Sequence, residues 1–209
     1  MNYWAMEAAE DSPFALMKDK ELFDALHRFG LSPSAAREAL RVAGYGPSLQ
    51  LFEPDSEVLA SPQLYVPDCI FCSWIAVFSA AARELCLDFG NVPEDFVPCH
   101  FLTRPGYTHF LHLPLDSPPV VDIGRSEFLM EIPADPPIPF HIARLALSGE
   151  PRTGCFRAAI PGYQQVFAEL MVSQAFKDAW ERRGLTGAEF RCLGTNDKNP
   201  LRAETISGT

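Results

Sequence analysis

The sequence predicts an α+β fold: a mixed or antiparallel sheet with a strand–helix–strand unit used twice, and an N-terminal helical hairpin. Two observations lead to this class. The stretches "AVFSAAARELCLDFGNVPEDFVPCH" and "LMVSQAFKDAWERRGLTGAEFRCLG" share one skeleton without a gap. Elsewhere, short apolar runs alternate with prolines and acids, and seven prolines between residues 114 and 139 exclude a long helix there.

Length and composition favour one globular domain. The chain has 209 residues, of which 47% are hydrophobic, and no apolar run reaches the ~18 residues that span a bilayer. We expect a domain over residues 1–196, with its main core at 65–193 and an insertion at 12–44, and a polar tail at 197–209. Because the start lacks a signal-peptide pattern, we expect a cytoplasmic protein whose six cysteines are reduced.

The first elements are a strand and two helices. "NYWAM" is expected to form a short strand. In "DSPFALMKDKELFDALHRFG", Ser12 fits a helix N-cap, Pro13 the first helical position and Gly30 the residue after the last turn. "LSPSAAREALRVAG" repeats this pattern. The two segments together predict a helical hairpin over residues 12–44.

Short strands are expected through the middle of the chain. Alternation and flanking turn residues predict extended segments at "LQLF", "EVL", "QLYV", "YTHFLHL", "PVVDI", "FHIARLAL" and "CFRAAI". The segments between Ser48 and Asp68 are short and lie between prolines and acids, which favours extended strands over helices.

The doubled unit has a structural explanation at every shared position. We expect each serine to cap a helix, the apolar positions to face inward, each glycine to end its helix and each phenylalanine to anchor the next strand. The residues of this pattern are Ser79, Gly90, Phe96, Ser173, Phe176, Trp180, Gly184 and Phe190. Cys86 and Cys192 occupy periodic apolar positions, where a thiol packs as a small hydrophobe. None of these residues forms a nucleophile–base pair, so the unit is interpreted as scaffold.

A metal site is the main alternative within the sequence. Cys69 and Cys72 with His109 and His112, and with Cys99 and His100 between the pairs, contain the ligand types of a tetrahedral zinc site. The odd spacing within each pair would direct its members to opposite faces of a strand. We therefore expect packed cysteines and histidines with no metal or other cofactor. A zinc-stabilised enzyme or regulator remains the alternative.

Catalysis has no support in the motifs. Patterns for nucleotide binding, zinc proteases, serine hydrolases and calcium loops do not occur in the sequence. The formal charge of −10 disfavours nucleic acid and favours basic partners, although such acidity also serves solubility. The acids concentrate between Arg41 and Arg83, where no lysine or arginine occurs, and between Asp116 and Asp135.

The order of several short blocks resembles a known family. "DCIFCS", "VVDIGRSEF", "FHIARLAL", "CFR" and the closing "MVSQAFKDAWERRGLTGAEF" follow one another as in the myxobacterial-type immunity proteins of bacterial polymorphic toxins. The resemblance covers residues 65–193, and "MNYWAM" is similar to the family's first strand. The predicted helical hairpin has no counterpart in it.

The resemblance implies a protein that binds and neutralises one cognate toxin, without catalysis, in interbacterial competition such as type VI secretion. The toxin is expected to act in the cytosol, as a nuclease or nucleotide-directed enzyme does; no nucleic-acid or membrane binding is expected. The alternative within this class is an adaptor that loads an effector for secretion. The acidic candidates for toxin contact are Glu53, Asp55, Glu57, Glu94, Asp95, Asp116, Asp122, Glu127 and Asp135.

Overall fold

The computed structural model describes residues 2–10, 12–17, 36–38, 40, 48–52, 66–72, 74–102, 104–132, 138–163 and 166–195. These residues form a mixed α+β fold that is mostly sheet, which confirms the predicted class at this level. Within them, no helix is long and apolar enough to cross a membrane.

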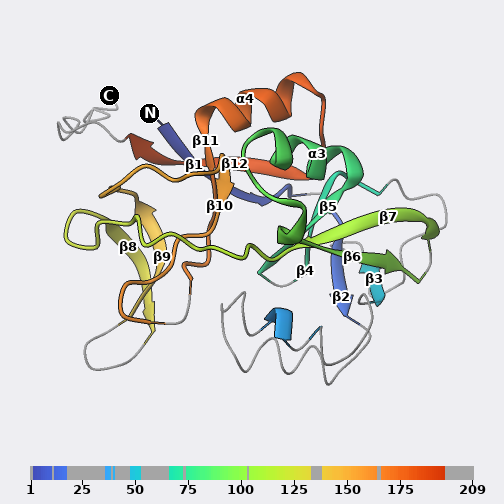
Figure 1. Cartoon of the computed structure of the whole chain (residues 1–209), viewed down its shortest axis with the longest axis horizontal. Helices are drawn as coiled ribbons and strands as arrows, with labels where there is room; N and C mark the ends of the chain where they lie inside the picture. The colour runs from blue at the N-terminus through green and yellow to red at the C-terminus, as the bar shows by residue number, and fades with distance from the viewer. Residues whose placement is uncertain are drawn as a thin grey trace, which may run out of the picture.

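The larger sheet has six strands in the order β2-β3-β6-β7-β5-β4 (Figure 1). Its strands are β2 (Phe14–Met17), β3 (Ser48–Phe52), β4 (Cys69–Cys72), β5 (Ile75–Ser79), β6 (Phe96–Phe101) and β7 (Arg104–His112). Neighbouring strands are antiparallel except β3 and β6, which are parallel, so this sheet is mixed.

A second sheet has four strands in the order β10-β11-β1-β12, all antiparallel to their neighbours. It consists of β1 (Asn2–Ala8), β10 (Cys155–Phe156), β11 (Leu170–Ser173) and β12 (Ala188–Thr195). The strands β8 (Glu127–Ile132) and β9 (Ile138–Arg144) form a separate pair. The helices with described bounds are α3 (Ala80–Asp88), α4 (Gln174–Arg182) and the short 3-10 turn η1 (Pro93–Asp95).

The doubled unit is present as the sequence predicts. The Ala82 N–H donates to Ser79 Oγ and the Phe176 N–H donates to Ser173 Oγ, each at 3.2 Å, so both serines cap a nine-residue helix. Gly90 has φ of 95° and Gly184 has φ of 64°. In this left-handed region a side chain is strained, which explains glycine just after each helix.

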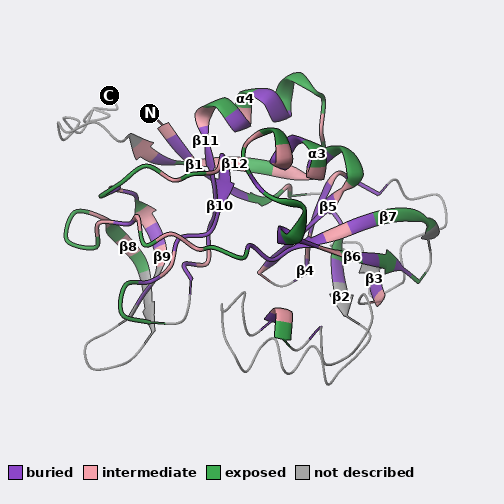
Figure 2. Cartoon of the chain, in the orientation of Figure 1, coloured by how far each residue is buried: buried purple, intermediate pink, exposed green. Residues whose placement is uncertain are grey.

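Each helix of the doubled unit has one buried face. Ala82, Leu85 and Cys86 of α3 are buried, and Phe176, Ala179 and Trp180 of α4 are buried in the same way. Figure 2 shows both helices with exposed residues on the outer side, and Figure 1 shows them next to each other across the sheets. One expectation is wrong here, because Cys192 is exposed, whereas Phe190 of the same strand packs against the core as expected.

The two copies also have the same strand arrangement, which the sequence comparison did not reveal. In the first copy, α3 leads from β5 to β6, and β7 lies between these two strands. In the second, α4 leads from β11 to β12, and β1 lies between them. Both middle strands are antiparallel to both neighbours, so β5 and β6 are parallel to each other, as are β11 and β12. Each copy is therefore a split β-α-β unit.

The register of the two units agrees residue by residue. Ser79 lies opposite His109 and Phe96 opposite His112 in the first unit. In the second, Ser173 lies opposite Tyr3 and Phe190 opposite Met6. The outer strands match as well, because Cys69 lies opposite Phe78 and Cys155 opposite Val172, one residue before each capping serine. The chain thus uses one fold element twice, with β1 completing the second unit.

Each unit docks on the other through the turn that follows its helix. The Gly154 N–H, just before β10, donates to Phe89 O at 2.8 Å. Reciprocally, the Cys69 N–H at the start of β4 donates to Thr186 O at 3.0 Å. A Cβ on Gly187 would collide with the carbonyl oxygen of Cys69. The two units therefore meet through backbone at both ends.

Three clusters of buried residues fill the fold. The middle cluster lies beneath α3 and α4 and takes residues from both units, including Phe78, Cys86, Cys155 and Trp180. A second cluster involves the larger sheet and the third involves the four-stranded sheet with Ile142. Because the middle cluster draws on both units, neither unit buries its apolar face alone.

Two expectations about single elements are wrong. Residues Phe14–Met17 form a strand paired with β3, so no helix begins at Ser12. The Ser12 hydroxyl is buried without a hydrogen-bond partner among the described residues, and the residue before a proline favours an extended backbone. Residues 36–38 and 40 are helical, whereas the rest of the predicted hairpin lies outside the described residues. "PVVDI" contributes only an isolated bridge, Val121 to Leu147.

Candidate functional site

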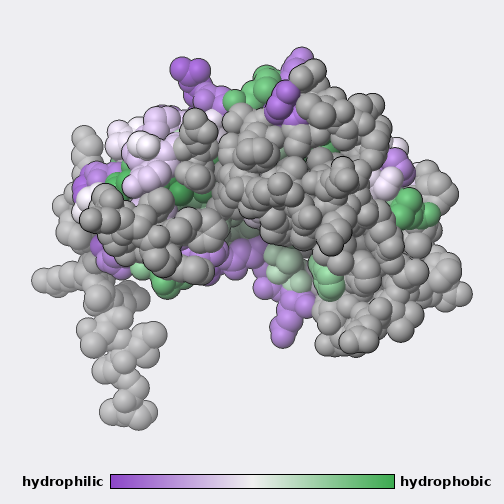
Figure 3. All heavy atoms as spheres, turned by 90° about the horizontal axis from the view of Figure 1, so that it is seen from below, coloured by the Kyte–Doolittle hydropathy of each residue, from purple (hydrophilic) through white to green (hydrophobic). Residues whose placement is uncertain are grey.

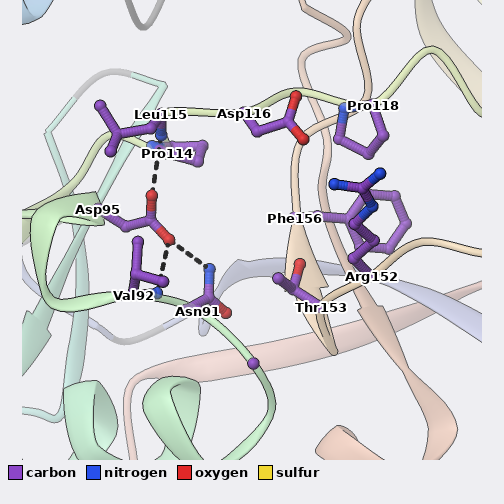
Figure 4. A pocket seen from close by; sticks show the side chains of 11 residues that line it. Asn91, Val92, Asp95, Pro114, Leu115, Asp116, Pro118, Arg152, Thr153 and Phe156 are labelled. Carbon is purple, nitrogen blue, oxygen red and sulfur yellow. Dashed lines mark hydrogen bonds between the residues drawn. The ribbon is translucent and has the colours of Figure 1, made fainter.

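A pocket of about 180 Å³ opens where the two units meet (Figure 4). Three segments form it: the turn between α3 and β6, the proline-rich loop after β7, and the segment before β10. Its lining residues are Gly90, Asn91, Val92, Asp95, Pro114, Leu115, Asp116, Pro118, Arg152, Thr153 and Phe156. The pocket therefore depends on the docking of one unit against the other.

The left-handed turn at Gly90 brings the first segment close to the second unit. A Cβ on Gly90 would lie 3.1 Å from Arg152 O, so only glycine allows this approach without displacement. The 3-10 turn η1 follows, with Pro93 at its start. This combination places Asn91 and Val92 at the pocket.

Asp95 ties two of the three segments together. Its carboxylate accepts hydrogen bonds from Val92 N at 3.0 Å and Leu115 N at 2.8 Å, and from Asn91 Nδ2 at 3.2 Å. Its own carbonyl accepts from the Leu113 N–H at 2.8 Å. Asp95 is only 5% exposed, so these bonds are sheltered from water and hold the pocket's shape.

A buried amide and imidazole lie behind Asp95. Asn91 Nδ2 also lies 3.3 Å from Nε2 of His112, whose ring packs against Phe78 and Phe96. Burial lowers the pKa of His112 to about 3, against the opposing effect of Asp95, so the imidazole is neutral at pH 7. Asn91 Oδ1 and His112 Nδ1 are buried without a hydrogen-bond partner among the described residues.

The rim of the pocket is exposed and combines apolar with charged residues. Val92 is 44% exposed and Leu115 is 61% exposed, and Glu94 and Asp116 are exposed next to them in the chain. Arg37 supports this rim from outside, since its guanidinium donates to the carbonyl oxygens of Leu113 and Glu94.

The predicted acidic contacts have different surroundings. Asp95 and Asp116 line the pocket and Glu94 adjoins it, although Asp95 is buried in a structural role. Asp122 and Glu127 lie elsewhere, 3.7 Å from Arg125 and 2.9 Å from Arg144 respectively. The remaining candidates, Glu53, Asp55, Glu57 and Asp135, fall outside the described residues.

The cysteine and histidine set is not brought together in the described residues. Cys69 belongs to the middle cluster whereas Cys72 belongs to the cluster of the larger sheet, as their spacing on a strand requires. His109 Nε2 lies 3.3 Å from Pro67 O, whereas His112 lies beside Asn91. No group of three or more possible metal ligands converges within the described ranges. All six cysteines are free thiols.

Several pocket residues escaped the sequence reasoning. Asn91, Arg152 and Thr153 belong to no motif, and Val92 and Leu115 read as ordinary loop residues. The available signal was local: a left-handed glycine followed by Asn and Pro in "FGNVPED", and the prolines of "PLDSPP". No local pattern indicates that the segment before β10 meets these two loops.

Comparison with known proteins adds no relative: no protein-family model matches the chain, and no curated protein matches it either. The resemblance to immunity proteins therefore stays an expectation from the sequence.

Proposed function

We propose that this chain is an immunity protein, which binds one cognate toxin in the bacterial cytosol and blocks it without catalysis. The observation that carries the proposal is the pocket rim, where the exposed apolar Val92 and Leu115 lie beside the acids Glu94 and Asp116. Apolar side chains around a hollow are typical of the anchoring centre of a protein contact. Acids around them select a partner with basic residues.

The stiffness of the rim supports a binding role. The Asp95 carboxylate fixes the backbone at Val92 and at Leu115, and Arg37 fixes the carbonyls behind them. A surface that is already ordered loses little conformational entropy when a partner binds. The rim therefore suits tight binding to one partner.

The charge of the chain supports a basic partner. At a net charge of −10, the chain attracts toxins that are themselves basic where they meet a nucleic acid or nucleotide.

Apolar residues are also exposed on β8 and at the end of β6, away from the pocket, as Leu129 and Leu102. On the face drawn in Figure 3, hydrophobic residues form small areas beside hydrophilic ones. At the pocket, apolar exposure, acids and a hollow coincide.

Co-expression tests the proposal. The product of the reading frame next to this gene is taken as the candidate toxin and expressed with and without the chain; survival is scored, and the complex is measured by calorimetry. Replacing Val92 and Leu115 by serine should weaken binding about 100-fold, because each lost apolar anchor costs about 1–2 kcal/mol. Leu129→Ser is the matched control, since Leu129 is 69% exposed and lies on β8, outside the pocket lining.

The outcomes separate the related functions. Protection and co-purification support an immunity protein. A toxin that stays lethal and does not co-purify contradicts the proposal. Binding without protection would instead indicate an adaptor that loads the effector for secretion.

A further inference from the structure

Three buried thiols gather where the two units meet. Cys69, Cys86 and Cys155 all belong to the middle cluster, and each is 0% exposed. Cys69 and Cys155 hold equivalent places at the starts of β4 and β10, whereas Cys86 lies on the buried face of α3. The first unit thus supplies two of these thiols and the second unit supplies the third.

Two of the thiols are in contact across the boundary between the units. The side chains of Cys86 and Cys155 share a hydrogen bond, although the two residues are far apart in the sequence. A disulfide joins sulfur atoms about 2 Å apart, and thiols that already touch need little movement to reach this distance. A bond between them would close a long loop and join the first unit to the second.

The same two residues lie behind the walls of the pocket. The carbonyl oxygen of Cys86 accepts a hydrogen bond from the Asn91 N–H at 3.1 Å. The carbonyl oxygen of Cys155 accepts one from the Thr153 hydroxyl at 3.0 Å, and Phe156 follows Cys155 in β10. Figure 4 shows Asn91 on one segment of the pocket and Thr153 and Phe156 on another. A bond between the two sulfurs would therefore connect these segments from behind.

The closed fold protects the pair from reagents. Burial raises the pKa of Cys86 well above its ordinary value, so this thiol stays protonated at neutral pH. Because the thiolate is the reactive form, the pair can react only when the two units separate briefly. A reducing compartment keeps such a pair as thiols.

We infer that Cys86 and Cys155 form a redox-sensitive latch, in which a small disulfide oxidises the pair to a bond that locks the two units together behind the pocket. When the units open, one thiolate attacks the reagent, forms a mixed disulfide and releases one thiol. The other thiolate then attacks the protein sulfur of the mixed disulfide and releases the second thiol. The protein loses two protons and two electrons, and the reagent is reduced to two thiols. The latch needs no toxin and goes beyond the proposed function.

Peptide mapping after oxidation tests the latch. Protein with Cys192→Ser, which removes the exposed thiol, is incubated with glutathione disulfide in buffer and in dilute urea below the unfolding midpoint. The remaining thiols are blocked with N-ethylmaleimide and the linked peptides are identified by mass spectrometry. Cys155 should be linked to Cys86, and the bond should form faster in dilute urea because opening exposes both thiols.

Fully unfolded protein is the control for native pairing. Short loops close most readily in a flexible chain, so Cys69–Cys72 and Cys86–Cys99 should be the main bonds formed in concentrated urea. The same pairing in native and unfolded protein would overturn the inference.

Stability distinguishes a latch from a damaging bond. The urea midpoint of the oxidised protein should rise by about 1 M or more, because the bond restricts the unfolded chain. Cys86→Ala and Cys155→Ala should each abolish the bond and the shift, whereas Cys69→Ala, equally buried in the same cluster, should keep both. If the alanine variants do not fold, the mapping in Cys192→Ser decides alone. Absence of a bond at Cys155, its linkage to Cys69, or an oxidised protein no more stable than the reduced one would each contradict the latch.

Discussion

Single polar side chains hold this fold where its loops meet its helices. Ser79 makes two such contacts at once. Its oxygen accepts a hydrogen bond from the Ala82 N–H, and its hydroxyl donates one to Asp68 Oδ1 at 2.7 Å. Asp68 also accepts from the backbone N–H and the hydroxyl of Thr186. One serine thus connects the start of α3 with the turn after α4.

Replacing Ser79 by alanine should destabilise the protein by about 1–2 kcal/mol, because the helix loses its cap and Asp68 loses a donor. Urea denaturation followed by circular dichroism measures the change. Ser79→Thr keeps the hydroxyl and should recover most of the stability. An alanine variant as stable as the parent would show that the cap contributes nothing.

The buried His112 should make the protein sensitive to acid. Burial lowers its pKa to about 3, so between pH 6.5 and 3 the unfolded chain binds a proton that the folded chain does not. Stability therefore falls as pH drops through this window, by up to about 1.4 kcal/mol per pH unit. Urea denaturation at pH 7, 5.5 and 4 measures the slope.

The variant His112→Gln isolates this contribution. It should lower stability at pH 7 but show a shallower loss toward pH 4 than the parent. His100→Gln is the control, because His100 is exposed. Parallel pH profiles for the parent and His112→Gln would contradict the prediction.

Residues whose role depends on near neighbours were predictable. The caps at Ser79 and Ser173 and the glycines after both helices follow from spacing within one turn. Asn91 and Arg152 were not predictable as pocket residues, because the two segments that carry them are about sixty residues apart in the sequence and only the fold brings them to one pocket. The acid-rich composition pointed to Asp116 and Asp95 alike, and it could not separate the exposed Asp116 from the buried Asp95.

At the scale of elements, the two helix units were foreseen and their strand partners were not. The pattern of a helix face lies within one short segment of the sequence. The strand between β11 and β12, in contrast, is β1, which is far away in the sequence. The same reason explains the error at Phe14–Met17. Pairing with β3 decides the conformation of these residues, and it overrides a capping pattern at Ser12 and Pro13.

The docking of the two units depends on Gly187. An alanine there would collide with Cys69 O and approach Pro67 Cβ to 2.7 Å, in addition to its strained φ of 87°. We expect a loss of about 3 kcal/mol or more from Gly187→Ala, measured by chemical denaturation. Gly184→Ala is the matched control: its φ is also positive but nothing lies within 4 Å, so it should cost about 1 kcal/mol. Equal losses would indicate that the docking contact is unimportant.

At the scale of the whole molecule, β1 occupies in the second unit the place that β7 occupies in the first. β7 follows β6 after residues 102–103, whereas β1 lies beside β12 with Asn2 opposite Thr195. The two strand ends that a hairpin would join are therefore already neighbours in space. The second unit therefore has the architecture of the first, except that no hairpin joins β12 to β1.

A circular permutant should close that connection. Joining Thr195 to Asn2 through a short Asn-Gly turn and opening the chain after Glu10 retains every strand pair of the four-stranded sheet. The product should fold with a stability within about 1 kcal/mol of residues 1–195, measured by thermal and urea denaturation. A permutant opened after Ala76 interrupts the central strand β5 and should not fold. If the permutant opened after Glu10 also fails to fold, the two units are not equivalent.

The open connection also sets the order of assembly during synthesis. A ribosome makes β1 before its two neighbours in the sheet, β11 and β12. The first unit can form while translation continues. Tyr3, Ala5 and Met6, in contrast, stay exposed to water until β11 and β12 have been made. The nascent protein should therefore depend on chaperones through its earliest strand.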